Sequence, residues 1–335
     1  MKKVFILAAF ASVMLAACSS DDSPTVKSDK NELGVSALVT SSVSTRAMVD
    51  NFAGTNKIGI FVSGTNYTPK VALYTFDGTS TWSAPTLSAD KIYLSNETAT
   101  VYGFYPADAT INGSLANDGT NKVDITVPAT QNIDGATGIV DYMYATAALD
   151  GSVYPLATAS NETNKDKVDL VFHHALSKIS FVINKGESYS GNGKLSKITL
   201  ANNTVVPGTP RFSTGNLTMA VATGNIATLG TTTGVDNLVI EGTAIDINAY
   251  NATPLTTVVT KTLFPPMAST ADITLKLVID GKEMSVALPA TAPADKWLAG
   301  KNYTYTVTVN GTNLIVNSVT ILGWDNIPSG SADVQ

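Results

Sequence analysis

Two segments near the C-terminal end have the pattern of β-hairpins, and they limit the folds open to this chain. Asp272–Leu288 carries alternating apolar residues on both sides of Asp280-Gly281, and Tyr303–Ile321 does the same around Asn310-Gly311. Alternation with a period of two is typical of strands that bury one face, and Asp-Gly and Asn-Gly allow the positive φ angles of tight turns. No segment beyond the N-terminal signal region shows a sustained 3.6-residue period, so the sequence predicts an all-β protein.

Strand signals continue through the rest of the chain. Its 335 residues are 44% apolar and only 14% charged, which is enough for one large or two ordinary domains with real cores. Short strand candidates are separated by Gly, Asn, Asp and Pro. They are Lys57–Val62, Val71–Phe76, Lys91–Leu94, Thr100–Tyr105, Lys122–Val127, Val168–Phe172, Lys178–Asn184, Lys194–Leu200 and Val258–Phe264. Asp141–Ala147 is either a strand or a short turn, and residues 201–237 are expected to form a long irregular excursion.

A polar stretch near the middle of the chain is the best candidate for a linker between domains. Asn161–Lys167 contains no apolar residue. Many short strands with turn signals on both sides of it predict two β-sandwiches. The expected organisation is a signal peptide over residues 1–17, a tether and N-terminal strand over 18–46, an N-terminal β-sandwich over 47–167 and a C-terminal β-sandwich over 168–335.

The first residues have the pattern of a targeting segment. Two lysines precede the apolar run Val4–Leu15, which is too short to span a bilayer. Leu15-Ala16-Ala17-Cys18, which contains the only Cys of the chain, resembles a bacterial lipobox; the alternative is an ordinary secretory signal that happens to contain a Cys. A lipobox predicts acyl chains on Cys18 that anchor the protein to a membrane. Ser19-Ser20-Asp21-Asp22 then resembles an export signal of outer-membrane lipoproteins.

The stretch Asn31–Arg46 separates this segment from the body of the protein. Its even positions are mostly small or polar, and its odd positions are mostly apolar, a pattern that predicts a strand with one buried face. The apolar odd positions are Leu33, Val35, Ala37, Val39 and Val43. Arg46 ends a Ser/Thr-rich run of the kind that proteases cut. We interpret the stretch as a strand that fills a groove in the body and is removed by cleavage after Arg46; the alternative is a surface arginine in a linker.

The chain's second arginine is Arg211, which follows Pro210 and is expected inside folded structure. An arginine-specific protease would then have one good target, at Arg46. The formal charge is −6, and the sequence has no basic run. Nucleic acid is therefore not an expected partner, because phosphate neutralisation needs clustered Lys and Arg.

Residues that carry catalysis or bind metals are scarce. The only two histidines, His173 and His174, are adjacent, and neighbours on a strand point to opposite faces, so they cannot easily share one metal. We expect one of them to pack or bond at a domain edge and the other to be solvated. The sequence contains no Gly-x-Ser-x-Gly elbow and no phosphate-binding loop. It therefore predicts no enzymatic activity, metal or cofactor, with a hydrolase built on scattered carboxylates as an alternative.

Four aromatic residues have two interpretations. Trp82, Tyr102, Phe104 and Tyr105 either line a glycan-binding platform or pack in the core of a sandwich. Aromatic side chains bury large areas and usually pack in cores or at sheet edges. We take packing in the core as the default.

Several short stretches, in their order and spacing, resemble the fimbrillin family, the lipoprotein precursors of type V pili. They are the lipobox at Cys18, Ser44–Ala47 before Ile58–Val62, Val101–Pro106, Asp141–Ala145, Phe172–Ile179, Trp297–Tyr303 and Val319–Trp324. The resemblance implies two transthyretin-like Greek-key β-sandwich domains and export as an outer-membrane lipoprotein. It also implies cleavage after Arg46 by an arginine-specific surface protease, which leaves Ala47 as the new N-terminus.

The resemblance further implies how subunits join. Loss of the N-terminal strand opens a hydrophobic groove, and a strand of another pilin subunit fills it. That donor would come from the C-terminal strands, whose candidate residues are Leu314, Val316, Val319 and Ile321. The expected function is a stalk, tip or anchor subunit of a surface fimbria that supports adhesion to host or bacterial surface ligands. The alternative is a surface lipoprotein that never polymerises and binds a glycan or a host ligand.

Overall fold

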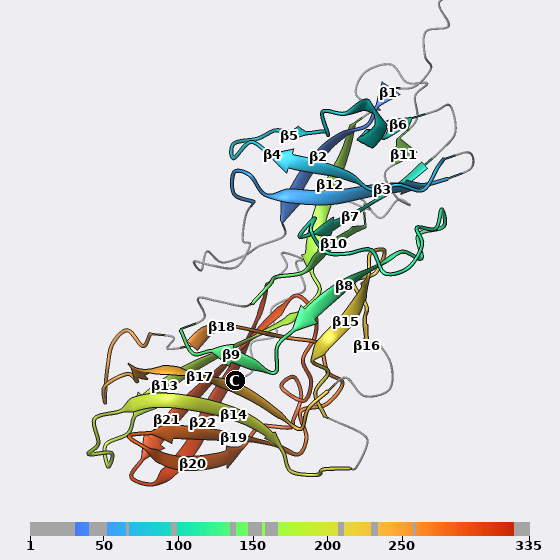
Figure 1. Ribbon diagram of the computed structural model, residues 1–335. Helices are drawn as coiled ribbons and strands as arrows, with labels where there is room; N and C mark the ends of the chain where they lie inside the picture. Colours follow the sequence, from blue (N-terminus) through green and yellow to red (C-terminus); the bar gives the residue numbers. More distant parts are fainter. Residues whose placement is uncertain are drawn as a thin grey trace, which may run out of the picture.

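The computed structural model confirms an all-β fold. It describes residues 31–39, 52–64, 67–94, 99–134, 139–146, 156–157, 167–206, 211–228, 234–256 and 259–324. The strands gather into an N-terminal lobe and a C-terminal lobe (Figure 1), and one short 3-10 turn, η1, covers Ser88–Asp90. Within these residues, no helix has the length and apolar character needed to cross a membrane.

The N-terminal lobe is built on an eight-stranded sheet with the order β2-β12-β10-β7-β3-β4-β5, in which β11 also pairs with β7. The strands are β2 Gly34–Val39, β3 Lys57–Ser63, β4 Ala72–Phe76, β5 Trp82–Ser83, β7 Ala99–Tyr105, β10 Met143–Thr146, β11 Leu156–Ala157 and β12 Lys167–His174. A separate pair joins β1 (Asn31–Glu32) to β6 (Tyr93–Leu94). The pairing of β2 with β12 is parallel, whereas the other pairings of the large sheet are antiparallel.

The C-terminal lobe contains three sheets, with the orders β18-β13-β21-β22, β20-β19-β14-β17-β9 and β16-β15-β8. The strands are β8 Lys122–Val127, β9 Thr130–Asn132, β13 Ser177–Lys185, β14 Lys194–Asn202, β15 Gly215–Ala220, β16 Ile226–Thr228, β17 Asn237–Asp246, β18 Val259–Phe264, β19 Ile273–Ile279, β20 Lys282–Ala287, β21 Lys301–Asn310 and β22 Asn313–Gly323. Both predicted hairpins are present, as β19–β20 and β21–β22. Asp280, Gly281 and Gly311 have the positive φ angles that the turns require.

The two lobes exchange segments of the chain. β8 and β9 come from the first half of the sequence, yet they pair with β15 and β17. β12 begins where the linker was expected to end, but it pairs with β2 and β10 of the N-terminal sheet. The boundary expected between residues 167 and 168 therefore falls inside β12, and the chain enters the C-terminal lobe at Ala175-Leu176. Residues 161–166 of the expected linker lie outside the described residues.

The prediction of an irregular excursion over residues 201–237 is wrong in part. β15 and β16 lie within it, and Leu217 and Met219 of β15 are completely buried. Besides the neighbouring β16, β15 pairs with β8, about 90 residues earlier in the chain, for example through the pair Leu217 and Ile125. Local composition gave no signal for this strand because its stability comes from distant pairing.

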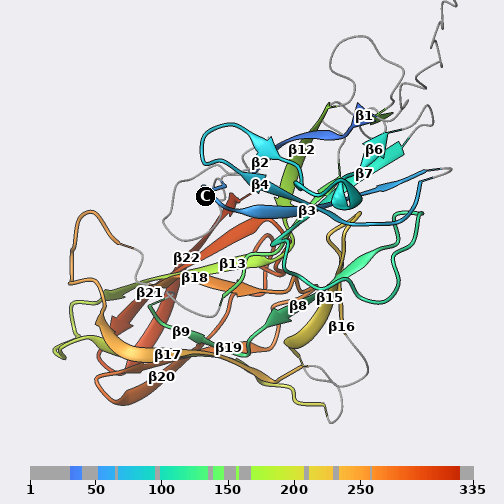
Figure 2. The same ribbon diagram turned by 45° about the horizontal axis from the view of Figure 1, so that its top comes forward.

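Two hydrophobic cores organise the lobes. One lies inside the N-terminal sheet, and the other extends from the C-terminal lobe to the opposite face of β3 and β7. Phe61 and Tyr102 stack on that opposite face with ring centroids 4.8 Å apart, and they share a core with Val123 and Ile125 of β8. Figures 1 and 2 both show β8 between the N-terminal sheet and the C-terminal strands. This shared core joins the lobes.

A close approach between β3 and β7 requires glycine at residue 59. Gly59 pairs with Phe104, whose buried ring covers it, and a Cβ at residue 59 would lie 2.2 Å from Cζ of that ring. We expect Gly59→Ala to lower the free energy of unfolding by about 1–3 kcal/mol, because the ring must move within a packed core. Urea denaturation measures this cost. The cost should shrink in a Phe104→Leu background, and an equal cost in both backgrounds would contradict the explanation.

Candidate functional site

The candidate site is the groove of the N-terminal lobe that β2 occupies. Alternate side chains of this segment enter the core: Leu33, Val35 and Ala37 are 0%, 4% and 7% exposed, and Val39 is half-buried. Leu38, between the last two, points outward and is 67% exposed. Burial of a Leu or Val side chain contributes about 1.5–3 kcal/mol, so Leu33 and Val35 together contribute about 3–6 kcal/mol.

One side of β2 pairs with β12 along its whole length. The parallel register runs from Gly34 opposite Lys167 to Val39 opposite Phe172. It places Val35 beside Val168, Ala37 beside Leu170 and Val39 beside Phe172. All six side chains pack in the same core. The strand therefore completes both a hydrogen-bonded ladder and a hydrophobic cluster.

Buried side chains hold the other side of β2. Trp82 Nε1 donates to the Ala37 carbonyl at 3.3 Å, and Tyr74 Oη donates to the Leu33 carbonyl at 2.5 Å. The Leu33 amide donates to the Ile92 carbonyl at 2.9 Å. We call the surface formed by Tyr74, Trp82, Ile92 and the inward side chains of β12 the β2 groove.

An ion pair and a buried tyrosine stabilise the start of the strand. Glu32 Oε2 and Lys91 Nζ form an ion pair at 2.6 Å, and this hydrogen bond raises the pKa of Lys91. Burial, with a smaller effect of the Glu32 carboxylate, raises the pKa of Tyr74 well above its usual range. The Tyr74 hydroxyl therefore stays protonated and keeps donating to the backbone of Leu33.

The two histidines face opposite sides of β12, and the buried one forms a structural contact between the lobes. His174 is 0% exposed, and its Nδ1 lies 3.0 Å from Oδ1 of Asp141. Its ring stacks on Trp324 with centroids 3.6 Å apart, and Lys178 Nζ lies 5.6 Å from the Trp324 ring centre. His173 is half-buried beside Tyr144. Across the described part of the chain, no group of three or more His, Cys, Asp or Glu residues is placed to hold a metal ion.

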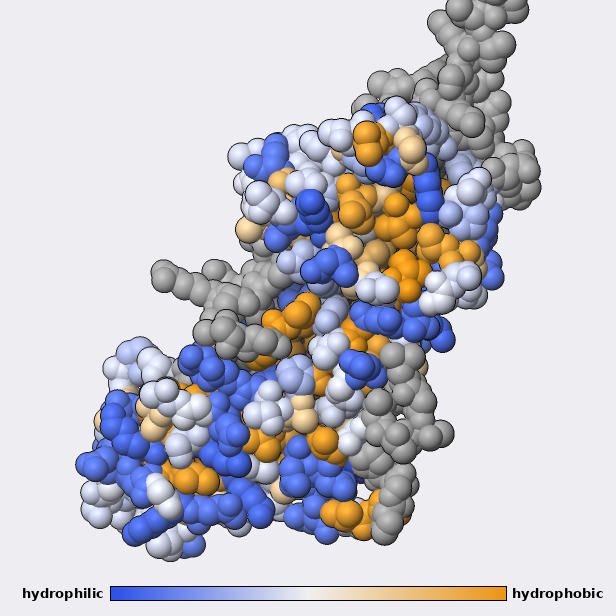
Figure 3. All heavy atoms as spheres, in the orientation of Figure 1, coloured by the Kyte–Doolittle hydropathy of each residue, from blue (hydrophilic) through white to orange (hydrophobic). Residues whose placement is uncertain are grey.

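Three of the four aromatic residues considered for a glycan platform lie in the cores. Trp82, Tyr102 and Phe104 are at most 7% exposed, so the core interpretation is confirmed for them. Tyr105 is half-buried and lines an open pocket of about 350 Å³ together with Lys57, Leu73 and Asp108, among others. Burial, followed by the carboxylates of Asp141 and Asp108, raises the pKa of Tyr105. Figure 3 shows apolar side chains gathered on this lobe around β3 and β7.

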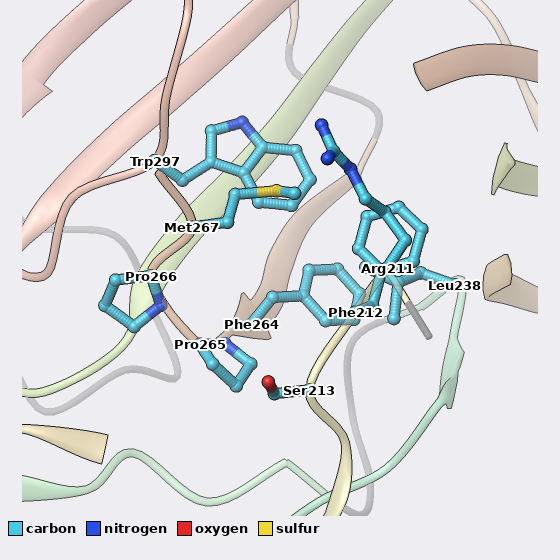
Figure 4. Close-up of a pocket in the computed structure, with 9 residues that line it drawn as sticks. All are labelled: Arg211, Phe212, Ser213, Leu238, Phe264, Pro265, Pro266, Met267 and Trp297. Carbon is cyan, nitrogen blue, oxygen red and sulfur yellow. The ribbon is translucent and has the colours of Figure 1, made fainter. Parts of the chain in front are cut away.

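Arg211 lies inside folded structure, as the sequence predicts. Its Nη2 donates to the carbonyls of Ser269 and Ala271 at 2.9 and 2.6 Å, and its amide donates to Asp236 at 3.3 Å. Figure 4 shows the side chain beside a small cavity of about 40 Å³, where Trp297 and Phe264 also lie. These bonds tie both the side chain and the backbone of Arg211 to the C-terminal lobe.

The candidate donor residues lie on β22, at the edge of a C-terminal sheet. Leu314 is buried, whereas Val316, Val319 and Ile321 are half-buried against the C-terminal core. The register shift opposite Thr306-Val307 leaves Asn317 as an extra residue, a β-bulge. This bulge changes the phase of the alternation, so that all four apolar side chains pack against the same core.

Other functional predictions fall outside the described residues. Cys18, Val43, Arg46 and Ala47 are among them, so lipidation and cleavage stay predictions. Sequence reasoning missed the two side-chain donors to β2, the contact of His174 with Asp141, and the place of Phe52 in the core beside the groove. None of these has a local signal, because each joins segments that are distant in the sequence.

The fold and the groove define an all-β protein whose first sheet is completed by a strand from the start of the chain. The model of the fimbrillin-like family matches residues 45–324, and the chain belongs to this family. A search of curated proteins gives no match.

Solved structures with the same fold cover most of the chain. A putative cell adhesion protein of Bacteroides uniformis is 19% identical with a TM-score of 0.57, and the match covers 88% of this chain and 99% of that one. A putative cell adhesion protein of Bacteroides ovatus is 14% identical with a TM-score of 0.59, covering 88% and 98%. A fimbrial protein of Bacteroides vulgatus is 13% identical with a TM-score of 0.54, covering 88% and 99%.

Tyr74→Phe tests how β2 is held. The substitution leaves the Leu33 carbonyl without its donor, and we expect a loss of about 1–3 kcal/mol. Backbone amides of β2 should exchange with deuterium at least about fivefold faster, as mass spectrometry of peptic fragments would show. Tyr189→Phe is a matched control, because Tyr189 donates to Asp280 in the C-terminal lobe. If both substitutions leave exchange in β2 unchanged, Tyr74 does not hold the strand.

The raised pKa of Tyr74 also has a pH signature. Below about pH 10, the usual tyrosine pKa, the residue is neutral in the folded and unfolded states alike. Above that pH the unfolded state loses the proton while the folded state keeps it, so stability falls as pH rises. We expect the decline between pH 9 and about pH 11 to be shallower for Tyr74→Phe than for wild type in urea denaturation. Parallel curves for the two proteins would contradict this.

Proposed function

We propose that this protein is a subunit of a surface fimbria in which β2 is a temporary strand. In this proposal, cleavage after Arg46 releases β2, and a strand of another pilin subunit takes its place. The observation that carries the proposal is the way β2 is held: three enclosed side chains and a parallel ladder at the edge of a sheet. A strand held in this way fills a preformed groove, and strand addition to an exposed sheet edge is a recurring mode of protein assembly.

Family and relatives support the fimbrial role. The chain belongs to the fimbrillin-like family, and the similar solved structures are described as a fimbrial protein and putative cell adhesion proteins. These descriptions agree with a cell-surface location and with other pilin subunits as partners. Acyl chains on Cys18 would anchor the precursor to the outer membrane, and an arginine-specific protease would act on it there. Host or bacterial surface ligands would be bound by the assembled fimbria.

A covered groove also makes physical sense for a precursor. Without β2, the edge of β12 that pairs with it would face water. The side chains of Val168, Leu170 and Phe172 would be exposed as well. Exposed sheet edges with apolar side chains beside them promote aggregation. A strand that belongs to the same chain covers the groove at high effective concentration until it is cut.

The arginines support a single processing site. Arg211 is fixed by three hydrogen bonds in the C-terminal lobe. Arg46 is the chain's other arginine, and it follows the end of β2. Cleavage after Arg46 would separate β2 from the body without cutting the body.

The C-terminal strand β22, which carries Leu314, Val316, Val319 and Ile321, remains our candidate donor. It is an edge strand with one paired neighbour, β21. To leave its own lobe, β22 would have to pull Trp324 out of its stack on His174, where Trp324 is only 4% exposed. This contact would keep β22 in its own lobe until assembly.

A second candidate function is glycan binding by the unassembled protein. The pocket at Tyr105 favours it, since Lys57, Asp108 and Thr55 add polar groups beside the aromatic ring, as in sugar-binding sites. Binding of the intact monomer to a glycan array, lost in Lys57→Ala, would support this role. Equal signals for wild type and Lys57→Ala would contradict it.

Arginine-specific digestion tests the fimbrial proposal. Wild-type precursor should give one resistant body that begins at Ala47 and forms ladders on a denaturing gel run without boiling. Arg46→Ala should remain uncut and monomeric. Arg211→Lys is the matched control, which removes the other arginine and should assemble as wild type does.

Two results would contradict the fimbrial proposal. One is cleaved wild type that stays monomeric. The other is assembly of Arg46→Ala to the same extent as wild type.

A further inference from the structure

Phe52 lies at one end of the β2 groove. It is 9% exposed, and its ring makes edge contacts with Trp82, Phe172 and Tyr105 at centroid distances of 4.8, 5.4 and 5.5 Å. Two of these rings also contact the β2 backbone or pair with it. Trp82 donates to the Ala37 carbonyl, and Phe172 is the ladder partner of Val39. Through these two rings, Phe52 is linked to the last inward positions of β2.

A hydrogen-bonded turn fixes Phe52 independently of β2. The Ala53 amide donates to Oδ1 of Asn56 at 2.6 Å, and the Asn56 amide donates back to the Ala53 carbonyl at 3.0 Å. The Thr55 amide donates to the Phe76 carbonyl, and the Phe76 amide donates to the Asn56 carbonyl, which ties the turn to the end of β4. None of these bonds involves a residue before Ala53.

The position of Phe52 explains how enclosure changes along β2. Side chains are enclosed at residues 33, 35 and 37, whereas Val39, next in the series, is only half-buried. Aromatic rings occupy the space around Phe172, the partner of Val39. The groove therefore offers three enclosed positions and a shallow fourth one next to these rings.

We propose that Phe52 is an end stop that remains in the β2 groove after β2 has left. This inference rests on the proposed function, since Phe52 lies on the retained side of Arg46. The groove then accepts a strand that runs parallel to β12, with apolar or small side chains at three alternate positions and no bulky side chain at the fourth. Phe52 thus selects the partner strand and fixes how far it enters.

A second copy of this chain carries such a strand. The inward series of β2 is Leu33, Val35, Ala37 and Val39, and the even residues of β22 are Leu314, Val316, Ser318 and Thr320. The two series match in size at every position, because Ser is close to Ala and Thr has the shape of Val. This register differs from the series that includes Val319 and Ile321, which depends on the bulge at Asn317. The occupant we assign is residues 314–320 of a second copy, with the bulge straightened.

The intact precursor provides the first test. Val39→Trp should lower the melting temperature by several degrees in wild type, because Phe52 blocks the larger side chain. The loss should be much smaller in a Phe52→Ala background, where the space is open. Phe76→Ala is the matched control: it also removes a ring beside Trp82, at 5.0 Å, but should give no rescue. An equal loss in the wild-type and Phe52→Ala backgrounds would overturn the end stop, and it would leave the fimbrial proposal untouched.

Cleaved protein provides the second test. Labelled peptides of residues 31–39 and 312–320, each with its native last residue or with Trp there, are added during arginine-specific digestion. Wild type should capture both native peptides and at least about tenfold less of the Trp peptides, and Phe52→Ala should remove this difference. Capture of the Trp and native peptides to the same extent by wild type would overturn the end stop. Capture of 31–39 but not 312–320 would overturn the assigned occupant.

The two tests separate the end stop from the fimbrial proposal. If neither native peptide is captured by either protein after Arg46 has been cut, strand exchange itself fails. The melting temperatures of the intact variants still decide whether Phe52 closes the groove.

Discussion

The N-terminal lobe depends on one parallel pairing between distant parts of the chain. β2, at the start of the described chain, forms the last strand of a sheet beside β12, about 130 residues later. The pairing completes a hydrogen-bonded ladder, and it closes a hydrophobic core that contains Val168, Leu170 and Phe172. Apart from this one ladder, side-chain packing and single hydrogen bonds to Tyr74, Trp82 and Ile92 hold the strand, so its removal would expose a groove without cutting through the sheet.

The same strand β12 also connects the groove to the C-terminal lobe. Its last residue, His174, bonds to Asp141 and stacks on Trp324, which follows β22. The shared core of β3, β7 and β8 joins the lobes at a second place. The inward face of β12 lines the groove, and its end contacts the segment that follows the candidate donor strand. The β2 groove and the end of β22 are thus both in contact with β12 within a single molecule.

Local sequence patterns predict the strands whose signals are local. The hairpins around Asp280-Gly281 and Asn310-Gly311, and strands such as β3 and β7, follow from alternation and turn residues. The same patterns do not predict which strands pair. The pairings of β8 with β15 and of β2 with β12 join segments that are far apart in the chain. Leu33, Val35 and Ala37 stand out by period alone, whereas Phe52, Tyr74 and Trp82 gain their roles from tertiary contacts. The bulge at Asn317 is also not predictable from periodicity. An unbroken alternation would place Leu314 and Ile321 on opposite faces, whereas the bulge brings them to the same face.

Hydrogen exchange in β12 measures most directly whether β2 is a temporary strand. Amides of Val168–Phe172 would be followed by mass spectrometry in the intact precursor, in protein cleaved at Arg46 and kept monomeric by dilution, and in the assembled form. Our account predicts strong protection in the precursor, loss of protection in the cleaved monomer and recovery after assembly. Unchanged protection of β12 after cleavage at Arg46 would contradict it.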